Sequence, residues 1–399
     1  MTSELARRVA FTLGALLIYR FGSHIPLAGI SIPAGPLSSS QIGRISIFSL
    51  SLIPYLSAAI VIQLVSVVWG RLSSLERSGE AGRRRIARFT LILTLLLAAF
   101  QAFGIASAIQ NIPGLVAEPG GWFLLSTTAS MVGGVFFLVW LSEQITRHGL
   151  GNGLALILFV GIVVSLPGEV VTALELSRQG AVSGNLLQFT ALLWVALVAV
   201  IVLVERARRN VPVQYAARRV GQRLLPSRSS MLPIKLNSAG FMIPATVTPW
   251  IFYLPLALAT FVFGQTPWLA AAYEHIQFAR PAHMILGAIA VFMLVFIYTA
   301  YVLDPEHAAE ALRERDGAIP GVAPGEPTAD YLDRVVSLTT VVGAVYLVAV
   351  SLIPEALVAY GGLPHFFGGG SALIVVCTIL DIETQVRGIS LTKPGGEYS

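Results

Sequence analysis

The chain is organised as long apolar stretches separated by short polar ones. Within the apolar stretches, hydrophobic residues run continuously and do not alternate with polar ones, which favours membrane-spanning helices over the strands of a barrel. A helix needs roughly 20 mostly apolar residues to cross a bilayer. The pattern therefore predicts an all-α polytopic membrane protein with ten transmembrane helices, at about residues 9–27, 45–69, 88–110, 122–145, 153–168, 186–205, 239–263, 282–303, 335–353 and 370–388.

The stretch 239–263 is interrupted more often than the others. It contains "AGFMIPATVTPWIFYLP", in which Pro244, Pro249 and Pro255 fall within one expected span. Proline removes a helical hydrogen bond, and broken membrane helices are typical of segments that line a cavity or a transport pathway. We therefore expect this segment to line a pore or to move. Isolated serines and threonines in the other spans are better explained by close packing between helices.

The composition agrees with lipid as the main solvent. Of the 399 residues, 55% are hydrophobic and only 12% are charged, whereas a soluble domain has about 25% charged residues. The single cysteine, Cys377, excludes a disulfide within the chain. The sequence contains no phosphate-binding loop motif, and its six histidines do not have metal-ligand spacing. We therefore predict that the chain is not an enzyme and needs no metal or cofactor.

The cations are distributed unevenly between the two sides of the expected membrane. The alternate loops contain only Arg44, Arg178 and Arg280, and Arg20 lies near the outer end of the first span. By the positive-inside rule, the cation-rich loops and both termini are cytoplasmic. Those regions hold 22 of the 26 lysines and arginines: both termini and the loops 70–88, 146–152, 205–236 and 304–334.

Two of these loops are long enough to project from the membrane. The segment 203–237 has eight cations, and the arrangement of Arg218, Arg219 and Arg223 indicates a basic surface helix or hairpin. Considered alone, it is best explained as an orientation signal that lies on anionic lipid, with a docking surface for an anionic partner such as RNA as the alternative. The acidic loop 304–334 is predicted to form a helix at 304–315, a Gly- and Pro-rich tip, and then a second helix.

Several stretches together resemble the SecY family, the channel subunits of the bacterial protein translocase. They occur in the family's order over nearly the whole chain. They are "RVAFTLGALLIYRFGSHIPLAG", "SIFSLSLIPYLSAAIVIQL", "GEAGRRRIARFT", "WLSEQITRHGLGNGLALILFVGIV", "VPVQYAARRVGQR", "LPIKLNSAG", "PGEPTADYLDRV" and "FFGGGSALIVV".

The resemblance implies two five-helix halves related as an inverted repeat. The N-terminal half would be 1–168, an external hinge 169–185, and the C-terminal half 186–399 with cytoplasmic loops 205–236 and 304–334. The implied function is a channel in the bacterial cytoplasmic (inner) membrane that passes unfolded preproteins and releases signal or transmembrane segments sideways into the phospholipid. The implied partners are a SecE-like subunit, SecG, and the SecA motor and/or the ribosome, the last with contact to ribosomal RNA.

The resemblance also assigns roles to residues at matching positions. An apolar pore ring would be formed by Leu52, Leu56, Leu154, Leu158, Thr246 and Ile374. A lateral gate, where the second and third spans meet the seventh and eighth, would include Ser57, Gln63, Gln101 and Thr248. Docking of the ribosome or SecA would use Arg206, Arg208, Arg209, Arg218, Arg219, Arg223, Arg228, Lys235 and the position of Ala323. In this assignment the basic loop is a docking surface, and the interpretation as an orientation signal is set aside.

The sequence departs from the family pattern at three places. Thr246 replaces a usually apolar ring residue. The segment "SIPAGPLSSSQIGR" is shorter than the family's plug region and is predicted to be a loop without a plug helix. The tip of the acidic loop has Ala323 where the family commonly has an arginine linked to SecA, which predicts altered coupling to that motor.

Two other functional classes remain as alternatives. A small-solute secondary transporter would also use broken helices, but it would need a polar site near the bilayer midplane, whereas the expected ring is almost wholly aliphatic. An accessory SecY paralogue or membrane scaffold, with altered plug and motor coupling, would account for the short segment and for Ala323.

Overall fold

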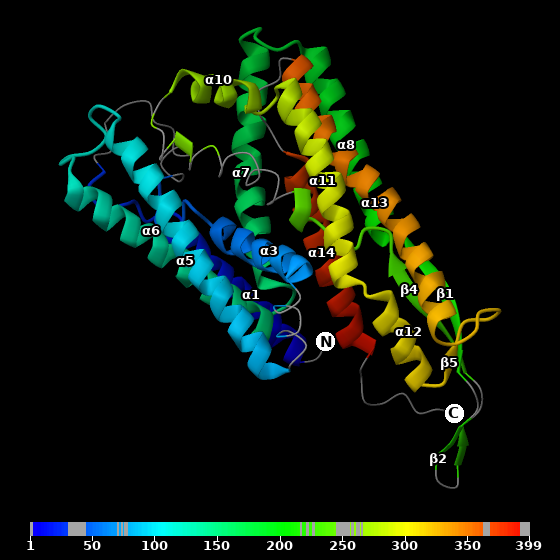
Figure 1. The fold of residues 1–399 in the computed structure, drawn as a ribbon. Helices are drawn as coiled ribbons and strands as arrows, with labels where there is room; N and C mark the ends of the chain where they lie inside the picture. The colour runs from blue at the N-terminus through cyan, green and yellow to red at the C-terminus, as the bar shows by residue number, and fades with distance from the viewer. Residues whose placement is uncertain are drawn as a thin grey trace. The chain divides into compact units, whose positions relative to one another are not determined.

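The computed structural model describes residues 3–30, 45–69, 72, 75, 79–215, 218–220, 223–225, 228–244, 256, 259–260, 264, 266–361 and 368–391 (Figure 1). The described chain is mostly helical. This agrees with the predicted helical class, and the structure adds five strands, which lie within 208–235 and at 317–318. The segment "SIPAGPLSSSQIGR", predicted to lack a plug helix, lies outside the described residues, as do Thr246 and Thr248.

The expected spans other than 239–263, which lies mostly outside the described residues, each overlap a helix. Six helical stretches of the described chain are long and apolar enough to cross a membrane: those at Glu80–Gln110, Gly121–His148, Gly153–Arg178, Gly184–Arg206, Pro281–Glu314 and Glu326–Gly361. The helices are α1 (Ser3–Gly22), α3 (Ile53–Val68), α5 (Glu80–Gln110), α6 (Gly121–His148), α7 (Gly153–Arg178), α8 (Gly184–Arg206), α10 (Pro267–Ile276), α11 (Pro281–Val302), α12 (Pro305–Glu314), α13 (Glu326–Gly361) and α14 (Gly369–Leu391).

Several helices differ from their expected bounds, and α3 and α7 show the physical reasons. Helix α3 begins only at Ile53, and Pro54 occupies its first turn, where a missing N–H costs no hydrogen bond. Helix α7 continues to Arg178 with Pro167 inside it, beyond the expected end at residue 168. Its start is fixed by Asn152, whose side chain accepts hydrogen bonds from the amides of Leu154 and Ala155.

The chain divides into two compact units. The first unit comprises residues 1–182 and 374–399. Within it, α6 packs against α1, α5 and α7, and α3 packs against α5 and α6. The turn from α6 to α7 lies so close to α6 that a Cβ atom on Gly153 would come within 1.9 Å of the Ser142 carbonyl oxygen. Glycine is therefore required at this position for the two helices to approach each other.

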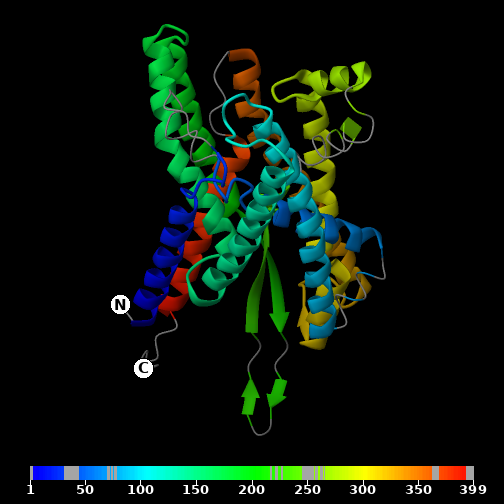
Figure 2. The same cartoon turned by 90° about the vertical axis from the view of Figure 1, so that its left-hand side faces the viewer.

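The second unit comprises residues 183–373. Helix α13 packs against α8, α11 and α12. Between α8 and α10 the chain forms a long antiparallel hairpin, visible as paired green arrows in Figure 2. Strand β1 (Arg208–Tyr215) pairs along its whole length with β4 (Arg228–Lys235), and the short strands β2 (Arg218–Val220) and β3 (Arg223–Leu225) pair with each other. Strand β5 (Gly317–Ala318) adds to β1, which gives the order β4-β1-β5.

Candidate functional site

The start of α3 contains two of the predicted ring residues. Leu52 is the residue that precedes the helix, and it is completely shielded from solvent; Leu56, one turn later, is 2% exposed. The two are joined along the backbone, because the amide of Leu56 donates to the carbonyl of Leu52 at 3.0 Å. Their spacing of four residues places both side chains on one face of the chain, and that face is fully packed.

The other described ring positions lie where α7 and α14 meet. Leu154 and Leu158 are half-buried on the first turns of α7, and Ile374 is 7% exposed on α14. The Thr378 hydroxyl, one turn beyond Ile374, donates to the Ile374 carbonyl at 2.6 Å and lies 3.5 Å from the Ala155 carbonyl of α7. The first unit therefore joins α7 directly to α14, and α3 is connected to α7 through α6.

The described gate candidates lie on α3 and α5, which pack against each other. The Ser57 hydroxyl is buried and donates to the Ile53 carbonyl at 2.8 Å. The Oε1 atom of Gln63 and the Nε2 atom of Gln101 are buried, and neither has a hydrogen-bond partner among the described residues. An unsatisfied buried polar atom costs about 1–3 kcal/mol, so both amides are unfavourable in this packing arrangement.

The predicted basic segment is a hairpin and not a helix. Arg208 and Arg209 are exposed on β1, and Lys235 is exposed on β4. Arg208 and Lys235 lie directly opposite each other in the strand register, where like charges repel. Arg206 is exposed at the end of α8, Arg228 lies opposite Tyr215 at the other end of β4, and the β2–β3 tip contains Arg218, Arg219 and Arg223.

The hairpin and the 304–334 loop form one folded body, which we call the platform: β1, β4, β5, α12 and the first turns of α13. The inward residues of β1, Val211 and Val213, are 1% and 2% exposed. They share a buried cluster with Ile234 of β4 and with residues of the acidic loop and α13: Leu312, Ile319 and Leu332. The two loops that sequence reasoning treated separately are therefore one structural element.

Ala323 lies at an exposed position on the turn between β5 and α13. Its carbonyl accepts a hydrogen bond from the Thr328 hydroxyl at 2.8 Å. Gly321 and Gly325 on either side have φ angles of +80° and +95°, a backbone conformation that glycine adopts without strain. The backbone of this tip is thus well defined, and its Ala323 side chain is a methyl group.

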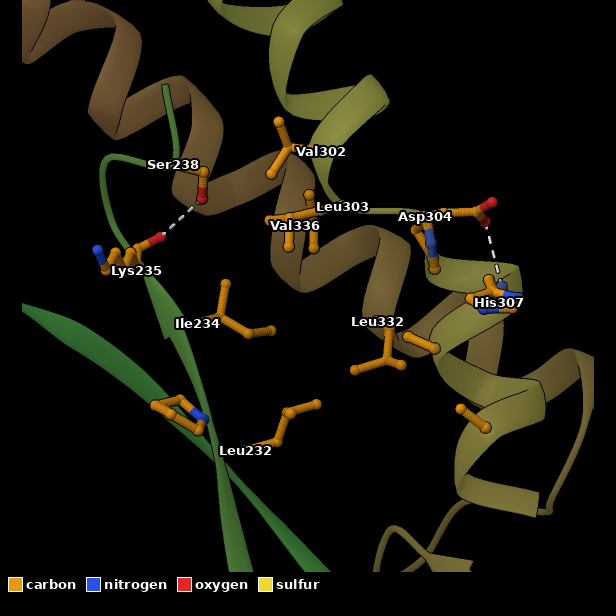
Figure 3. Close-up of a pocket in the computed structure, with 14 residues that line it drawn as sticks. Leu232, Ile234, Lys235, Ser238, Val302, Leu303, Asp304, His307, Leu332 and Val336 are labelled. Carbon is orange, nitrogen blue, oxygen red and sulfur yellow. Dashed lines mark hydrogen bonds between the residues drawn. The ribbon is translucent and has the colours of Figure 1, made fainter. Parts of the chain in front are cut away.

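A groove of about 560 Å³ opens at the base of the platform, between β4, α13 and the corner from α11 to α12 (Figure 3). Its walls are mainly aliphatic, with Leu232, Ile234, Val302, Leu332 and Val336 labelled in the figure. Two of its polar side chains are hydrogen-bonded: Asp304 caps α12 by accepting from the His307 amide at 3.1 Å, and the Ser238 hydroxyl donates to the Lys235 carbonyl at 3.4 Å. The groove marks the place where the hairpin leaves the membrane helices.

These features agree with the comparisons with known proteins. A family model named SecY matches residues 46–383. The chain is 39% identical to the protein translocase subunit SecY of Escherichia coli K12, over 98% of this chain and 93% of that protein. The chain belongs to the SecY family. It is also 38% identical to the SecY subunit of Vibrio cholerae (96% of this chain, 91% of that protein) and 36% identical to that of Rickettsia bellii (97% and 94%).

Solved structures of SecY-type channels have the same fold. A SecY structure described for its plug domain, which stabilises that channel's closed state, superposes with a TM-score of 0.71 at 18% identity, over 98% of this chain and 94% of that one. Sec61 from the canine ribosome-channel complex superposes with a TM-score of 0.65 at 18% identity, with the same coverage. A structure described as a protein-conducting channel gives 0.66 at 17% identity, again with that coverage.

Sequence reasoning missed two buried polar groups of this SecY family member. Asn237, at the end of the hairpin, donates to Glu205 of α8 at 2.7 Å, and the Tyr346 hydroxyl of α13 donates to the same Glu205 oxygen at 3.2 Å. At the other end of the second unit, His283 Nδ1 lies 2.5 Å from Glu355 Oε1, and both side chains are 7% exposed. No local pattern could indicate either set of contacts, because the partners are 32, 141 and 72 residues apart.

Proposed function

We propose that this chain is the protein-conducting subunit of a Sec translocase, and that it passes unfolded preproteins across the membrane. The observation that carries the proposal is the match to translocase subunits along nearly the whole chain, which leaves no room for a different core architecture. A channel for unfolded chains cannot recognise one side chain, because its substrates vary in sequence. It must instead seal against ions while it admits a polypeptide.

The seal in this proposal is the aliphatic ring. Leu52, Leu56 and Ile374 are buried, and Leu154 and Leu158 are half-buried, so these positions offer no polar group to a water molecule. A narrow apolar neck excludes ions because they do not give up their hydration shells to enter it. Thr246 would be the single polar position of the ring.

The lateral gate in this proposal involves the packing of α3 and α5. The buried Oε1 atom of Gln63 and Nε2 atom of Gln101 have no hydrogen-bond partner among the described residues, so an opening that gives these atoms partners would remove an energetic cost of the closed packing. Ser57 and Thr248 would complete the gate. An apolar signal segment that leaves through the opening gains free energy as it enters lipid, at about 25 cal/mol per Å² of buried apolar surface.

The docking surface in this proposal is the platform with its basic hairpin. The exposed Arg208, Arg209 and Lys235 suit the phosphates of ribosomal RNA, and the fold match to Sec61 from a ribosome-channel complex supports the ribosome as a partner. SecA would use the same surface, and SecE-like and SecG subunits would complete the complex. The absent arginine at Ala323 points to altered motor coupling, which an accessory translocon would also display.

The remaining architecture of the proposal follows the SecY pattern. We propose ten spans in two inverted halves, 1–168 and 186–399, with 169–185 as the external hinge. We propose that both termini and the platform lie on the cytoplasmic side of a bacterial inner membrane, which the positive-inside rule supports through the cation-rich segments.

The experiment is reconstitution of the complex, purified from native membranes with its partners, into lipid vesicles. We expect an unfolded preprotein with a signal sequence to become protected from added protease, and a preprotein without the signal sequence to remain sensitive. Protection of neither, together with saturable uptake of small solutes, would support a secondary transporter. Recovery of the partners without any protection would support a scaffold.

A further inference from the structure

The hairpin is attached to the membrane helices of the second unit by a buried polar network at its base. Asn237 is 4% exposed, and its side-chain amide donates to Glu205 at 2.7 Å and accepts from the Gly240 amide at 3.0 Å. Tyr346, 8% exposed, donates to the same Glu205 oxygen. Glu205, at the end of α8, therefore connects the hairpin base to the middle of α13.

The backbones of the hairpin base and of α13 also lie in close contact beside this network. A Cβ atom on Gly343, one turn before Tyr346, would lie 2.5 Å from the Leu236 carbonyl oxygen. The Leu236 amide also donates to the Ala207 carbonyl, at 3.3 Å, directly after α8. Such close approach leaves the hairpin base little freedom to pivot on α13 while the network is intact.

A second attachment lies further along the same helix. Leu332 of α13 is 2% exposed in the cluster that contains Val211, Val213 and Ile234 of the hairpin. Leu332 and Tyr346 are 14 positions apart in the sequence, which corresponds to about 21 Å along a helix. Two attachments separated by this distance fix the angle between hairpin and helix, whereas either one alone would allow rotation about a single point.

We propose that Asn237 is a positioning residue that makes the platform and α13 move as one body, so that a partner bound at the platform shifts the membrane helices packed against α13. This inference rests on the proposed function, because it concerns the step between partner docking and channel opening. The network is suited to this role because the half-buried Glu205 accepts from one donor on the hairpin base and one donor on α13, so both segments are held by the same carboxylate oxygen. The apolar cluster at Leu332 supplies the second point of attachment.

The test compares Asn237→Ala with two variants of its hydrogen-bond partner, Glu205. Glu205→Ala removes the acceptor, while Glu205→Gln keeps an amide oxygen that accepts both hydrogen bonds. Tyr346→Phe removes a single hydroxyl and keeps the packing. Each variant is reconstituted as the whole complex, and two quantities are measured: binding of purified ribosomes to the vesicles, and translocation of a preprotein driven by the bound partner.

We expect Asn237→Ala and Glu205→Ala to lower translocation about three- to tenfold, in the range of couplings transmitted through packed networks. Ribosome binding should stay within about twofold, because the exposed cations are untouched. Glu205→Gln should retain translocation, and the double alanine variant should lose little more than either single variant. Equal losses of binding and translocation, or no loss of translocation, would overturn the proposal. A parent complex that neither binds nor translocates would instead refute the proposed function.

A distance measurement provides a readout independent of activity. Spin labels are placed at Ser229 on β4 and Val345 on α13, both exposed, after the single native cysteine has been changed by Cys377→Ala. The distance distribution should be narrow in the parent and in Glu205→Gln, and clearly broader in Asn237→Ala and Tyr346→Phe. Identical distributions in all four would show that the network does not hold the platform.

Discussion

The aliphatic positions of the first unit and the basic hairpin of the second unit place their side chains in opposite environments. Leu52 and Leu56 are almost completely shielded, whereas Arg208 and Arg209 are exposed on a strand that projects from the helices (Figure 2). Apolar contacts are insensitive to salt, while exposed charges act over about 8–10 Å and are screened by it. The comparison indicates that sealing and docking are governed by different forces and can be altered separately.

The largest effect is expected at the hairpin tip. Replacing Arg218, Arg219 and Arg223 with alanine should weaken ribosome binding about 100-fold at low salt and reduce the slope of log K against log salt by about 3. The measurement is a salt titration of ribosome binding to vesicles. The triple alanine variant at Arg83, Arg84 and Arg85, three exposed cations of α5, removes the same charge elsewhere. Equal losses in both variants would mean that binding depends on net charge and not on the hairpin.

A smaller effect is expected at the ring. Leu56→Asn places an amide where the parent has a buried aliphatic side chain. The polar group lowers the free-energy cost of wetting the neck by about 1–3 kcal/mol. We therefore expect the ion leak to rise roughly tenfold. Resting conductance in planar bilayers is the measurement. Leu56→Met is the control, because it keeps the volume and the apolar character.

The ring assignment would be contradicted by equal conductance in the parent, in Leu56→Asn and in Leu56→Met. A large leak already present in the parent would instead indicate that the seal needs a partner. In neither case would the salt dependence of ribosome binding change, since that property belongs to the basic hairpin.

The smallest effect is expected at the tip of the acidic loop. Ala323→Arg adds a guanidinium at an exposed position with a defined backbone. A new surface contact to a motor protein is worth about 0.2–1 kcal/mol, so SecA-driven translocation should rise at most about fivefold. Ala323→Gln, which adds length without charge, is the control. No change relative to the parent would show that this position does not limit motor coupling.

The sequence allowed some elements of the structure to be predicted and not others, for physical reasons. Continuous apolar runs predicted α5, α6, α8, α11 and α13, because a membrane helix satisfies its own backbone within one segment. The sequence of the acidic loop likewise predicted a short helix at 304–315, and α12 begins directly after Asp304. These are local signals, and the structure confirms them.

The hairpin and the polar network depend on contacts between distant segments. Val211 and Val213 alternate with exposed neighbours, and this period of two indicates a strand. The arrangement of the cations in the segment, however, was compatible with either a helix or a hairpin. Glu205, Asn237 and Tyr346 meet only after α8, the hairpin and α13 have packed, so no pattern within one segment could reveal them. The roles of the ring positions rest on the resemblance to the SecY family, since an isolated leucine in a membrane helix more often faces lipid or packs in the core.

The central claim, that an unfolded chain passes along the aliphatic ring, is tested most directly by crosslinking. A photoreactive residue is placed at Leu56, at Leu158 or at Ile374, and a preprotein is arrested halfway through the reconstituted channel. Leu192 on α8 and Ile289 on α11, which are 68% and 56% exposed on membrane helices, serve as lipid-facing controls. We predict strong crosslinks from the three ring positions to the arrested chain and almost none from the controls. Crosslinks of equal strength at all five positions, or their absence from the ring, would contradict the account.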